Sequence, residues 1–363
     1  MSAPLLVIAA GGTGGHMFPA QALAEEVLQR GWRVKLSTDP RGARYAGGFP
    51  QVVERIVLRS GTFARGGLLW KLLTPALIAW GILGALAAML RDRPACVAGF
   101  GGYPALPAMA AAWALRVPRL IHEQNGVLGR VNQVFARRVN AIACGTWPTA
   151  LPPGLDGENI GNPVRGSIRA AAGGGYELPE AGPLTLLVFG GSQGASVMSD
   201  VPAALGELPD TLRARLNVMH QARDADRQDV AAAYDALGVS AEIHPFFDDM
   251  PARMVAAHLV ICRAGASSVA DLTVIGRPAI LIPLAIAKRD EQTANARPLV
   301  EAGAAVMMTE PELTPTALAG HIRAMLENPA RAQAMAAAAR GLGKPHAARA
   351  LADLVARIAG HTP

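Results

Sequence analysis

Short apolar runs alternate with helix-length segments along most of the 363-residue chain. This alternation is typical of an α/β fold with parallel sheets, because each crossover between parallel strands needs a helix-length connection. We expect strands near Leu5–Ala10, Arg33–Ser37, Val52–Val57, Ala95–Gly99, Arg119–His122 and Ala141–Cys144, and a second series near Leu184–Phe189, Leu216–His220, Ala241–His244, His258–Cys262 and Ala279–Pro283. The pattern therefore predicts two series of parallel strands, one in each half of the chain.

The length of the chain predicts two domains, at roughly 150 residues per domain. The segment 145–163 is dense in Pro and Gly and is a candidate hinge. We expect an N-terminal domain over 1–163, a C-terminal domain over 164–343, and a helical segment over 344–363 that packs back on the N-terminal domain. The expected fold class is α/β, with two Rossmann-like parallel-sheet domains facing a cleft.

The composition excludes several classes of protein. Apolar residues make up 51% of the chain and charged residues 17%, which excludes a disordered chain. The three cysteines, Cys96, Cys144 and Cys262, fit no metal-ligand spacing and are expected to be buried thiols in a reducing compartment. We expect neither a metal nor a cofactor. The N-terminal segment has no basic stretch before its apolar run, so no signal peptide is predicted and a cytoplasmic-side protein is expected.

The positive charge lies in the first half of the chain. Residues 1–163 hold 16 Lys and Arg against 8 Asp and Glu, whereas residues 164–363 hold 18 against 20. This asymmetry favours an anionic partner for the first half. We find no basic stripe interleaved with aromatic residues, so nucleic acid is not expected as a partner. The surface of an anionic membrane is the favoured partner.

The segment 72–90 carries no charge over 19 positions. It could span a membrane, form a helix whose exposed part touches a membrane, or lie in the core. The strand expected at Ala95–Gly99 favours the second interpretation, since a span would separate strands of one sheet. Thr74 and Pro75 suit the N-cap and first position of this helix. Trp80 and Trp113 are candidate interface residues, with core aromatics as the alternative.

Each half opens with a strand that leads into a glycine loop and a helix, at 5–16 and at 184–196, and a third loop follows a strand at 99–104. Such loops suit phosphate, because the helix N-terminus offers unpaired N–H groups and a positive dipole end. Neither of the two opening loops has the G-x-G-x-x-G pattern or a P-loop lysine, which disfavours NAD and ATP. A purely structural tight turn is the alternative interpretation of a single loop.

Six motifs in order identify a resemblance: GGTGGH at 11–16, GFGGYP at 99–104, HEQN at 122–125, GNPVR at 161–165, GGSQGA at 190–195 and CRAGASSVAD at 262–271. The chain resembles, over essentially its whole length, the MurG family of peptidoglycan N-acetylglucosaminyltransferases, of glycosyltransferase family 28, which convert lipid I to lipid II. The resemblance implies a GT-B fold with the UDP-GlcNAc donor on the C-terminal domain and the lipid I acceptor on the N-terminal domain. It also implies a peripheral location on the cytoplasmic face of the bacterial inner membrane, and cell-wall synthesis proteins as partners.

The resemblance implies roles for residues of the first half. Thr13, Gly14 and Gly15 would lie where the acceptor pyrophosphate meets the transferred sugar, and Asn125 would bind the GlcNAc ring of the donor. Arg165 would contact the nucleotide.

The donor contacts implied for the second half come from three segments. Ser192 would hydrogen-bond the donor phosphates. Phe247 would meet uracil through its backbone, so that the identity of its side chain would matter little. Ala266 and Ser267 would contribute backbone and hydroxyl contacts at a helix start, and Gln292 would contact sugar hydroxyls.

Two positions depart from the family pattern. Asp271 stands where the family usually has Glu, whose carboxylate would hold the ribose hydroxyls, and Glu291 stands where many relatives have His or Gln. Asp is one methylene shorter than Glu, so a ribose contact needs a shift of the backbone or a bridging water, and the Glu291 carboxylate can accept from a sugar hydroxyl but cannot donate.

The implied reaction displaces UDP from the anomeric carbon of GlcNAc by the 4-hydroxyl of the acceptor, with inversion. The N–H groups of Gly190–Ala195 could stabilise the leaving diphosphate without a metal. The sequence has no D-x-D pair in a strand-end loop. The adjacent pair Asp248 and Asp249 is expected to cap a helix at Met250.

A base must take the proton of the acceptor hydroxyl. His16 is the favoured base because its ordinary pKa suits that role, and a structural role at the helix start is the alternative. His122 is expected to hold the cleft together, and Glu123 is a weaker candidate base.

Two other functions remain open at this point. One is a different GT-B enzyme, such as a glycolipid glycosyltransferase or a UDP-GlcNAc 2-epimerase. The other is a single-span membrane protein with a nucleotide-sensing domain.

Overall fold

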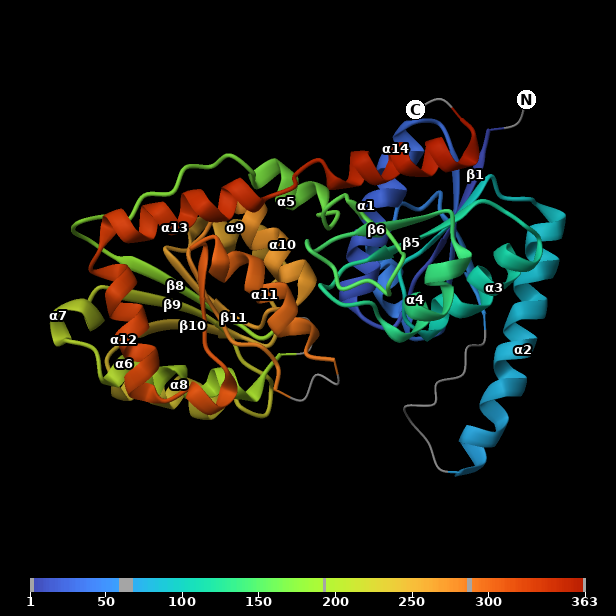
Figure 1. Ribbon diagram of the computed structural model, residues 1–363. Coiled ribbons are helices and arrows are strands. Elements are labelled where there is room, and N and C mark those ends of the chain that lie inside the picture. Colours follow the sequence, from blue (N-terminus) through green and yellow to red (C-terminus); the bar gives the residue numbers. More distant parts are fainter. Residues whose placement is uncertain (1–2, 59–67, 192–193, 286–288, 362–363) are drawn as a thin grey trace. The chain divides into compact units, whose positions relative to one another are not determined.

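The computed structural model describes residues 3–58, 68–191, 194–285 and 289–361 (Figure 1). The chain divides into two compact units, Met1–Arg165 together with Pro345–Pro363, and Gly166–Lys344. Each unit contains one parallel sheet, and the expected α/β class with a parallel sheet in each half is confirmed.

The first unit is built on a seven-stranded sheet in the order β3-β2-β1-β4-β5-β6-β7. Its strands are β1 (Leu5–Ala9), β2 (Arg33–Thr38), β3 (Glu54–Val57), β4 (Cys96–Gly99), β5 (Arg119–Glu123), β6 (Ala141–Cys144) and β7 (Glu158–Asn159). Its helices are α1 (Gly14–Gln29), η1 (Gly42–Gly48), α2 (Leu68–Arg91), η2 (Tyr103–Ala105), α3 (Leu106–Ala114), α4 (Arg130–Phe135), η3 (Ala136–Arg138) and α14 (Ala347–Ala359), where η marks a 3₁₀ helix.

Apolar side chains cover both faces of this sheet. Leu6 and Ile8 of β1 belong to a buried cluster with residues of α1 and α14, whereas Leu5 and Val7 belong to another with residues of α2 and α3. Successive residues of a strand point to opposite faces, so β1 is apolar throughout because helices cover both of its faces.

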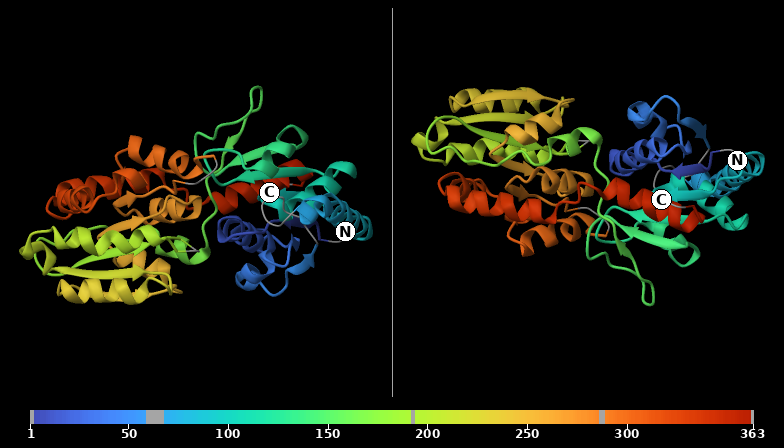
Figure 2. Two further views of the ribbon diagram at one scale, coloured as in Figure 1. Left: turned by 90° about the horizontal axis from the view of Figure 1, so that it is seen from below. Right: turned by 90° about the horizontal axis from the view of Figure 1, so that it is seen from above.

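The C-terminal helix α14 belongs to the first unit, although the second unit precedes it in the chain. Both views of Figure 2 show this red helix against the blue elements of that unit. Leu351 and Val355 of α14 are buried in the same cluster as α1. Arg30, which follows α1, donates from Nη1 to Asp353 Oδ1 over 2.6 Å. Apolar burial and an ion pair therefore attach α14 to the first unit.

The second unit is built on a six-stranded sheet in the order β10-β9-β8-β11-β12-β13. Its strands are β8 (Leu184–Phe189), β9 (Leu216–Gln221), β10 (Ser240–His244), β11 (Leu259–Cys262), β12 (Ala279–Leu281) and β13 (Ala305–Met307). Its helices are α5 (Gly166–Ala171), η4 (Ser196–Asp200), α6 (Val201–Gly206), α7 (Asp210–Arg213), α8 (Arg227–Ala236), α9 (Met250–Ala256), α10 (Ala266–Ile275), α11 (Glu291–Glu301), η5 (Glu310–Glu312), α12 (Pro315–Leu326) and α13 (Pro329–Leu342).

The beginning of α2 differs from the sequence prediction. The helix starts at Leu68, so Thr74 and Pro75 lie inside it and do not form its N-cap and first position. Apolar residues continue before Thr74, and a helix can extend through them although Pro75 removes one backbone donor. Among the described residues, α2 is the one helix long and apolar enough to cross a membrane, with a mean hydropathy of 1.5 over Thr74–Arg91.

Candidate functional site

Three segments of the first unit meet at the carboxyl end of β1. A Cβ atom added to Gly11 would lie 2.7 Å from Pro104 Cβ and 2.9 Å from Thr38 Oγ1. A Cβ atom at Gly102 would lie 3.0 Å from the Gly11 carbonyl oxygen and 3.8 Å from His16 Cε1. The first glycine loop, the third glycine loop and the end of β2 are therefore packed too closely for a side chain at Gly11.

Helix α1 begins at Gly14, directly after this loop. Thr13 occupies the N-cap position in an extended conformation, and its side chain does not cap the helix. Its Oγ1 instead lies 3.2 Å from His16 Nδ1. The first N–H groups of α1 and its positive dipole end face the loop, which suits the phosphates of a ligand. Thr13, Gly14 and Gly15 thus stand where an anion can bind, and their predicted acceptor contacts remain predictions.

His16 is half-buried at the start of α1, and its desolvation lowers its pKa to about 4. The imidazole is therefore neutral at pH 7 and can accept a proton, but the pKa near neutral pH on which the sequence prediction rested does not hold in this structure. The tautomer decides which nitrogen can act: when Nδ1–H donates to Thr13 Oγ1, Nε2 carries the lone pair.

Arg165, the last residue of the first unit before the chain enters the second, is held over an aromatic ring of α1. Its guanidinium carbon lies 4.6 Å from the centre of the Phe18 ring. A Cβ atom at Gly14 would lie 3.0 Å from Phe18 Cε2. Phe18 therefore positions the cation of Arg165 beside the N-terminus of α1, and the predicted contact of Arg165 with the nucleotide remains a prediction.

The carboxyl end of β5 carries His122 and Glu123, which are both buried. His122 Nε2 donates to the Gly161 carbonyl oxygen over 3.1 Å, and burial lowers its pKa to about 4. His122 thus joins β5 to the GNPVR segment as a neutral side chain. Asn125 follows two residues later, and its side-chain Nδ2 donates to Glu123 Oε1 over 3.0 Å.

The second glycine loop follows β8 in the second unit. A Cβ atom at Gly190 would lie 2.2 Å from Ala195 N, so the loop can close on itself only with glycine there. The loop leads into the 3₁₀ helix η4 before the six-residue α6. Ser192 lies outside the described residues, and its predicted phosphate contact remains a prediction.

Helix α10 begins at Ala266, and three residues separate it from the end of β11. The Ser267 Oγ atom is buried and has no hydrogen-bond partner within the described part of the chain. Asp271, one turn further on, is buried on the same helix face. A helix N-terminus, a hydroxyl and a carboxylate thus lie together, and they match the predicted phosphate and ribose contacts in chemistry.

The start of α11 holds Glu291 and Gln292. Gln292 Oε1 accepts from the Leu284 backbone N–H over 3.1 Å, which leaves the Nε2 hydrogens as the donors that it can offer to a sugar hydroxyl. Glu291 lies in the first turn, where the helix dipole stabilises a carboxylate. The acidic residue that departs from the family pattern therefore suits its local position.

Phe247 and Asp249 precede α9. The sequence predicted that the identity of the Phe247 side chain matters little and that Asp249 caps the helix, and the structure differs on both points. The Phe247 side chain is buried, with the Arg253 guanidinium carbon 4.0 Å from its ring centre, so its identity matters for packing. Asp249 occupies the N-cap position but makes no capping bond; its Oδ1 accepts from Arg253 Nε over 2.6 Å. The guanidinium one turn further along attracts the carboxylate more strongly than the backbone N–H groups do.

Two buried polar residues without a role predicted from the sequence fix the loops of the second unit. Arg263 Nη1 donates to the carbonyl oxygens of Ile282 and Pro283 and pairs with Glu310 over 2.6 Å. Asn295 Nδ2 donates to the Ala264 carbonyl oxygen over 3.1 Å. An arginine directly after an apolar strand, inside the CRAGASSVAD motif, was the available signal, since a buried charge needs fixed partners.

A metal site is not formed by the described residues, which contain no group of three or more His, Cys, Asp and Glu side chains that could hold an ion.

The fold and these loops define a glycosyltransferase with two Rossmann-like units. Residues 6–144 match the N-terminal domain of glycosyltransferase family 28, and residues 185–354 match its C-terminal domain. The chain belongs to this family and, within it, to the MurG enzymes; it is a hexosyltransferase.

Individual relatives cover nearly the whole chain. Proteins of Rhodopseudomonas palustris (strain BisB18) and Rhodospirillum centenum are each 48% identical over 99% of this chain and 96% of their own length. Both are named UDP-N-acetylglucosamine–N-acetylmuramyl-(pentapeptide) pyrophosphoryl-undecaprenol N-acetylglucosamine transferase. The crystal structure of Acinetobacter baumannii MurG is 31% identical, with a TM-score of 0.79 over 98% of this chain and 99% of that chain. The kitacinnamycin glycosyltransferase, at 19% identity and a TM-score of 0.72, shares the fold.

Acidification is expected to destabilise the first unit through His122. Its pKa is about 4 in the folded protein against about 6.5 in an unfolded chain, so the unfolded chain binds more protons between these values. The free energy of unfolding therefore rises with pH across this window and is fully gained above it; about 3 kcal/mol is lost on going from pH 7 to pH 4. Urea titrations from pH 4 to pH 7 measure this loss. His122→Gln should make the profile shallower without abolishing it, because His16 and His220, whose pKa values are also lowered to about 4, still contribute, and an unchanged profile in that variant would contradict the assignment.

Proposed function

We propose that this chain transfers GlcNAc from UDP-GlcNAc to the 4-hydroxyl of MurNAc-pentapeptide in lipid I, with inversion, and so forms lipid II for peptidoglycan synthesis. The observation that carries the proposal is the match to relatives of that name along 99% of the chain. The chemistry of the two units supports it. In the first unit β1 leads into a glycine loop, and in the second unit β8 does so; such loops suit phosphate, and both substrates contain a diphosphate.

The acceptor is assigned to the first unit and the donor to the second. In the first unit the N-terminus of α1, with Thr13, Gly14 and Gly15, receives the acceptor pyrophosphate. In the second unit the N-terminus of α10, with Ala266, Ser267 and Asp271, receives the phosphates and ribose of UDP. Ser192, Phe247, Arg165, Asn125 and Gln292 complete the proposed donor contacts.

The transfer is a single displacement. The 4-hydroxyl oxygen of the acceptor forms a bond to the anomeric carbon, and the bond from that carbon to the UDP oxygen breaks, with the electron pair leaving on UDP. Backbone N–H groups of the loop after β8 stabilise the growing charge on the leaving diphosphate. The hydroxyl proton passes to His16 Nε2, because Thr13 holds Nδ1 and the ring is neutral.

The proposed function predicts that UDP is released from UDP-GlcNAc only when a soluble lipid I analogue is present. A coupled assay for UDP measures this with and without the acceptor. Consumption of the donor without an acceptor would point to an epimerase or a hydrolase and would overturn the proposal.

Replacing His16 separates catalysis from structure. His16→Ala should lower kcat by about 10²- to 10⁴-fold, because the step loses its base, and should leave the KM for UDP-GlcNAc nearly unchanged. His16→Gln is the matched control, since it restores a hydrogen bond to Thr13 without a basic nitrogen and should be equally slow. Near-normal turnover in either variant would leave His16 only its structural role.

We further propose that the enzyme docks on the cytoplasmic face of the inner membrane through the apolar surface of α2 and α3. Trp80, Leu83 and Leu90 of α2 are 70%, 59% and 66% exposed, and Trp113 of α3 is 51% exposed. These aromatic residues are therefore not core residues. Tryptophan is stable at a membrane interface, where one side of the ring is apolar and the other is wet.

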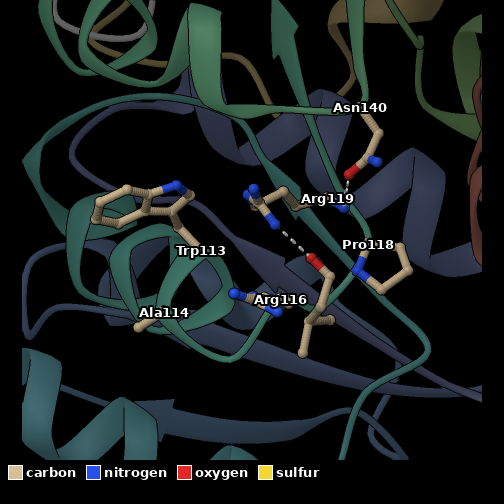
Figure 3. Close-up of a pocket in the computed structure, with 7 residues that line it drawn as sticks. Trp113, Ala114, Arg116, Pro118, Arg119 and Asn140 are labelled. Carbon is tan, nitrogen blue, oxygen red and sulfur yellow. Dashed lines mark hydrogen bonds between the residues drawn. The ribbon is translucent and has the colours of Figure 1, made fainter.

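Basic residues lie beside this surface. The Arg138 guanidinium carbon is 5.6 Å from the Trp113 ring centre. An open pocket of about 600 Å³ is lined by Trp113, Arg116 and Arg119, among others. Figure 3 labels these three residues. Arg119 Nη1 donates to the Val117 carbonyl oxygen over 2.7 Å, which fixes its side chain at the pocket. Cations next to exposed tryptophan favour anionic lipid headgroups.

The sheet argues against a membrane span. β3 precedes α2 and β4 follows it, and both lie in the one sheet of the first unit. A span would require the chain to cross the bilayer a second time without a helix in order to return to the sheet. Docking of one face of α2 avoids this requirement.

Vesicle sedimentation tests the docking surface. Trp80→Ser should reduce binding to vesicles that contain phosphatidylglycerol, while turnover of the soluble acceptor analogue is unchanged. Val300→Ser, at an exposed apolar position of the second unit, is the control and should bind like the parent enzyme. Equal vesicle binding by the Trp80 variant would contradict the assignment, and resistance of the bound enzyme to carbonate extraction would contradict a peripheral location.

A further inference from the structure

Glu123 is a buried carboxylate, 1% exposed, at the carboxyl end of β5. Four N–H groups donate to it. Oε1 accepts from Asn125 N over 3.1 Å and from Asn125 Nδ2 over 3.0 Å. Oε2 accepts from Gly129 N over 2.7 Å and from Asn132 Nδ2 over 2.8 Å. Each oxygen thus receives two donors, which is the number that its lone pairs accommodate.

The donors of Glu123 come from three different places in the first unit. Asn125 belongs to the HEQN segment, Gly129 is the N-cap residue of α4, and Asn132 lies within that helix. A Cβ atom at Gly101 of the third glycine loop would lie 3.2 Å from Asn132 Nδ2. The carboxylate therefore connects the end of β5, the start of α4 and the side chain that supports the third loop.

This arrangement makes Glu123 a poor proton acceptor for the reaction. Burial raises the pKa of its carboxyl group, and the hydrogen bonds from Gly129, Asn125 and Asn132 oppose that rise. Both oxygens are already engaged by these N–H groups, so an incoming hydroxyl would have to displace one of them. The bonds to Asn125 instead determine how its amide is oriented.

An amide can take two orientations, but Glu123 permits only one of them. With Nδ2 toward the carboxylate, Asn125 donates a hydrogen bond; with Oδ1 there, two oxygen atoms would face each other. Asn125 Oδ1 and the second Nδ2 hydrogen are therefore held in one orientation. A sugar that bears several hydroxyls and an acetamido group needs its protein partners fixed in this way.

We propose that Glu123 is a positioning residue of the transfer reaction, which fixes the amide of Asn125 for contact with the transferred GlcNAc. The proposal rests on the proposed function, because the contact of Asn125 with the sugar is part of that function. Glu123 acts through Asn125 and moves no proton itself.

Glu123→Gln is the first test. The glutamine NH₂ group would face two of the four donors, so the hydrogen bonds that orient the Asn125 amide are lost. Binding of UDP-GlcNAc should weaken by about 10- to 100-fold, the cost of losing hydrogen bonds to a charged group, and kcat/KM should fall with it. Binding of UDP, which lacks the GlcNAc that Asn125 would contact, should be unchanged. Calorimetry measures the dissociation constants of UDP-GlcNAc and of UDP for this variant and the parent enzyme. Equal weakening of both affinities would overturn the proposal.

A double-mutant cycle distinguishes positioning from direct catalysis. In an Asn125→Ala background, Glu123→Gln should lower kcat/KM by less than 3-fold more, since the residue through which it acts is gone. If the two substitutions lower kcat/KM by factors that multiply in full, the proposal is overturned. The pH profile of kcat should keep its shape in Glu123→Gln, whereas loss of its acidic limb would make Glu123 a base.

Two further variants guard against a trivial loss of structure. Gln124→Leu removes a neighbouring buried side chain whose Nε2 donates to the Phe100 carbonyl oxygen over 3.1 Å. It should lower stability without separating UDP-GlcNAc binding from UDP binding. If Glu123→Gln fails to bind UDP, Glu123→Asp keeps the charge but cannot reach all four donors, and should show the same separation. An inactive parent enzyme would overturn the proposed function, whereas an active parent with independent mutations would overturn only the role of Glu123.

Discussion

All strands of each sheet run parallel, so their carboxyl ends lie at one edge, and the groups assigned to the reaction lie mostly in the loops at that edge. The close approach of these loops depends on glycine. A methyl group at Gly11 would collide with Pro104, and one at Gly190 would collide with the backbone at Ala195. Where side chains are excluded, backbone N–H groups are exposed to a ligand, and a diphosphate is the ligand that they suit.

His16 and Glu123 show how the surroundings assign roles to ionisable side chains. Burial disfavours the charged form of both, which lowers the pKa of His16 and raises that of Glu123. Within the described part of the chain, the His16 ring forms one side-chain hydrogen bond, to Thr13, so one ring nitrogen can still exchange a proton. Glu123 has all its acceptor sites engaged. The residue with an unengaged nitrogen suits the chemistry, and the fully bonded residue suits the support of a neighbour.

Much of the fold could be predicted from the sequence, because strands covered on both faces are apolar along their length. β6 and β8 begin and end at the predicted residues. The two-residue β7 and the three-residue β13 were missed, since such short strands leave no pattern. Local rules failed where a stronger neighbour competed. Asp249 accepts a hydrogen bond from Arg253 instead of capping the helix backbone. Helix α2 begins at Leu68, ahead of the predicted start at Thr74, because apolar residues precede Thr74.

The candidate site was less predictable than the fold, because its decisive contacts join residues that are not adjacent in sequence. HEQN showed that Glu123 and Asn125 are close, but the bonds to Gly129 and Asn132 depend on the turn into α4. The uncharged segment 72–90 had a similar ambiguity, since the same composition suits a core helix, a span or an interfacial helix. The sheet bears on the choice among these three. β3 and β4 lie in one sheet, so both flanks of α2 lie on the same side of a bilayer. Only 22% of the segment Thr74–Arg91 is buried, which disfavours a core helix. The proposed interfacial docking of α2 rests on this combination of an apolar, exposed helix with flanks that are held in one sheet.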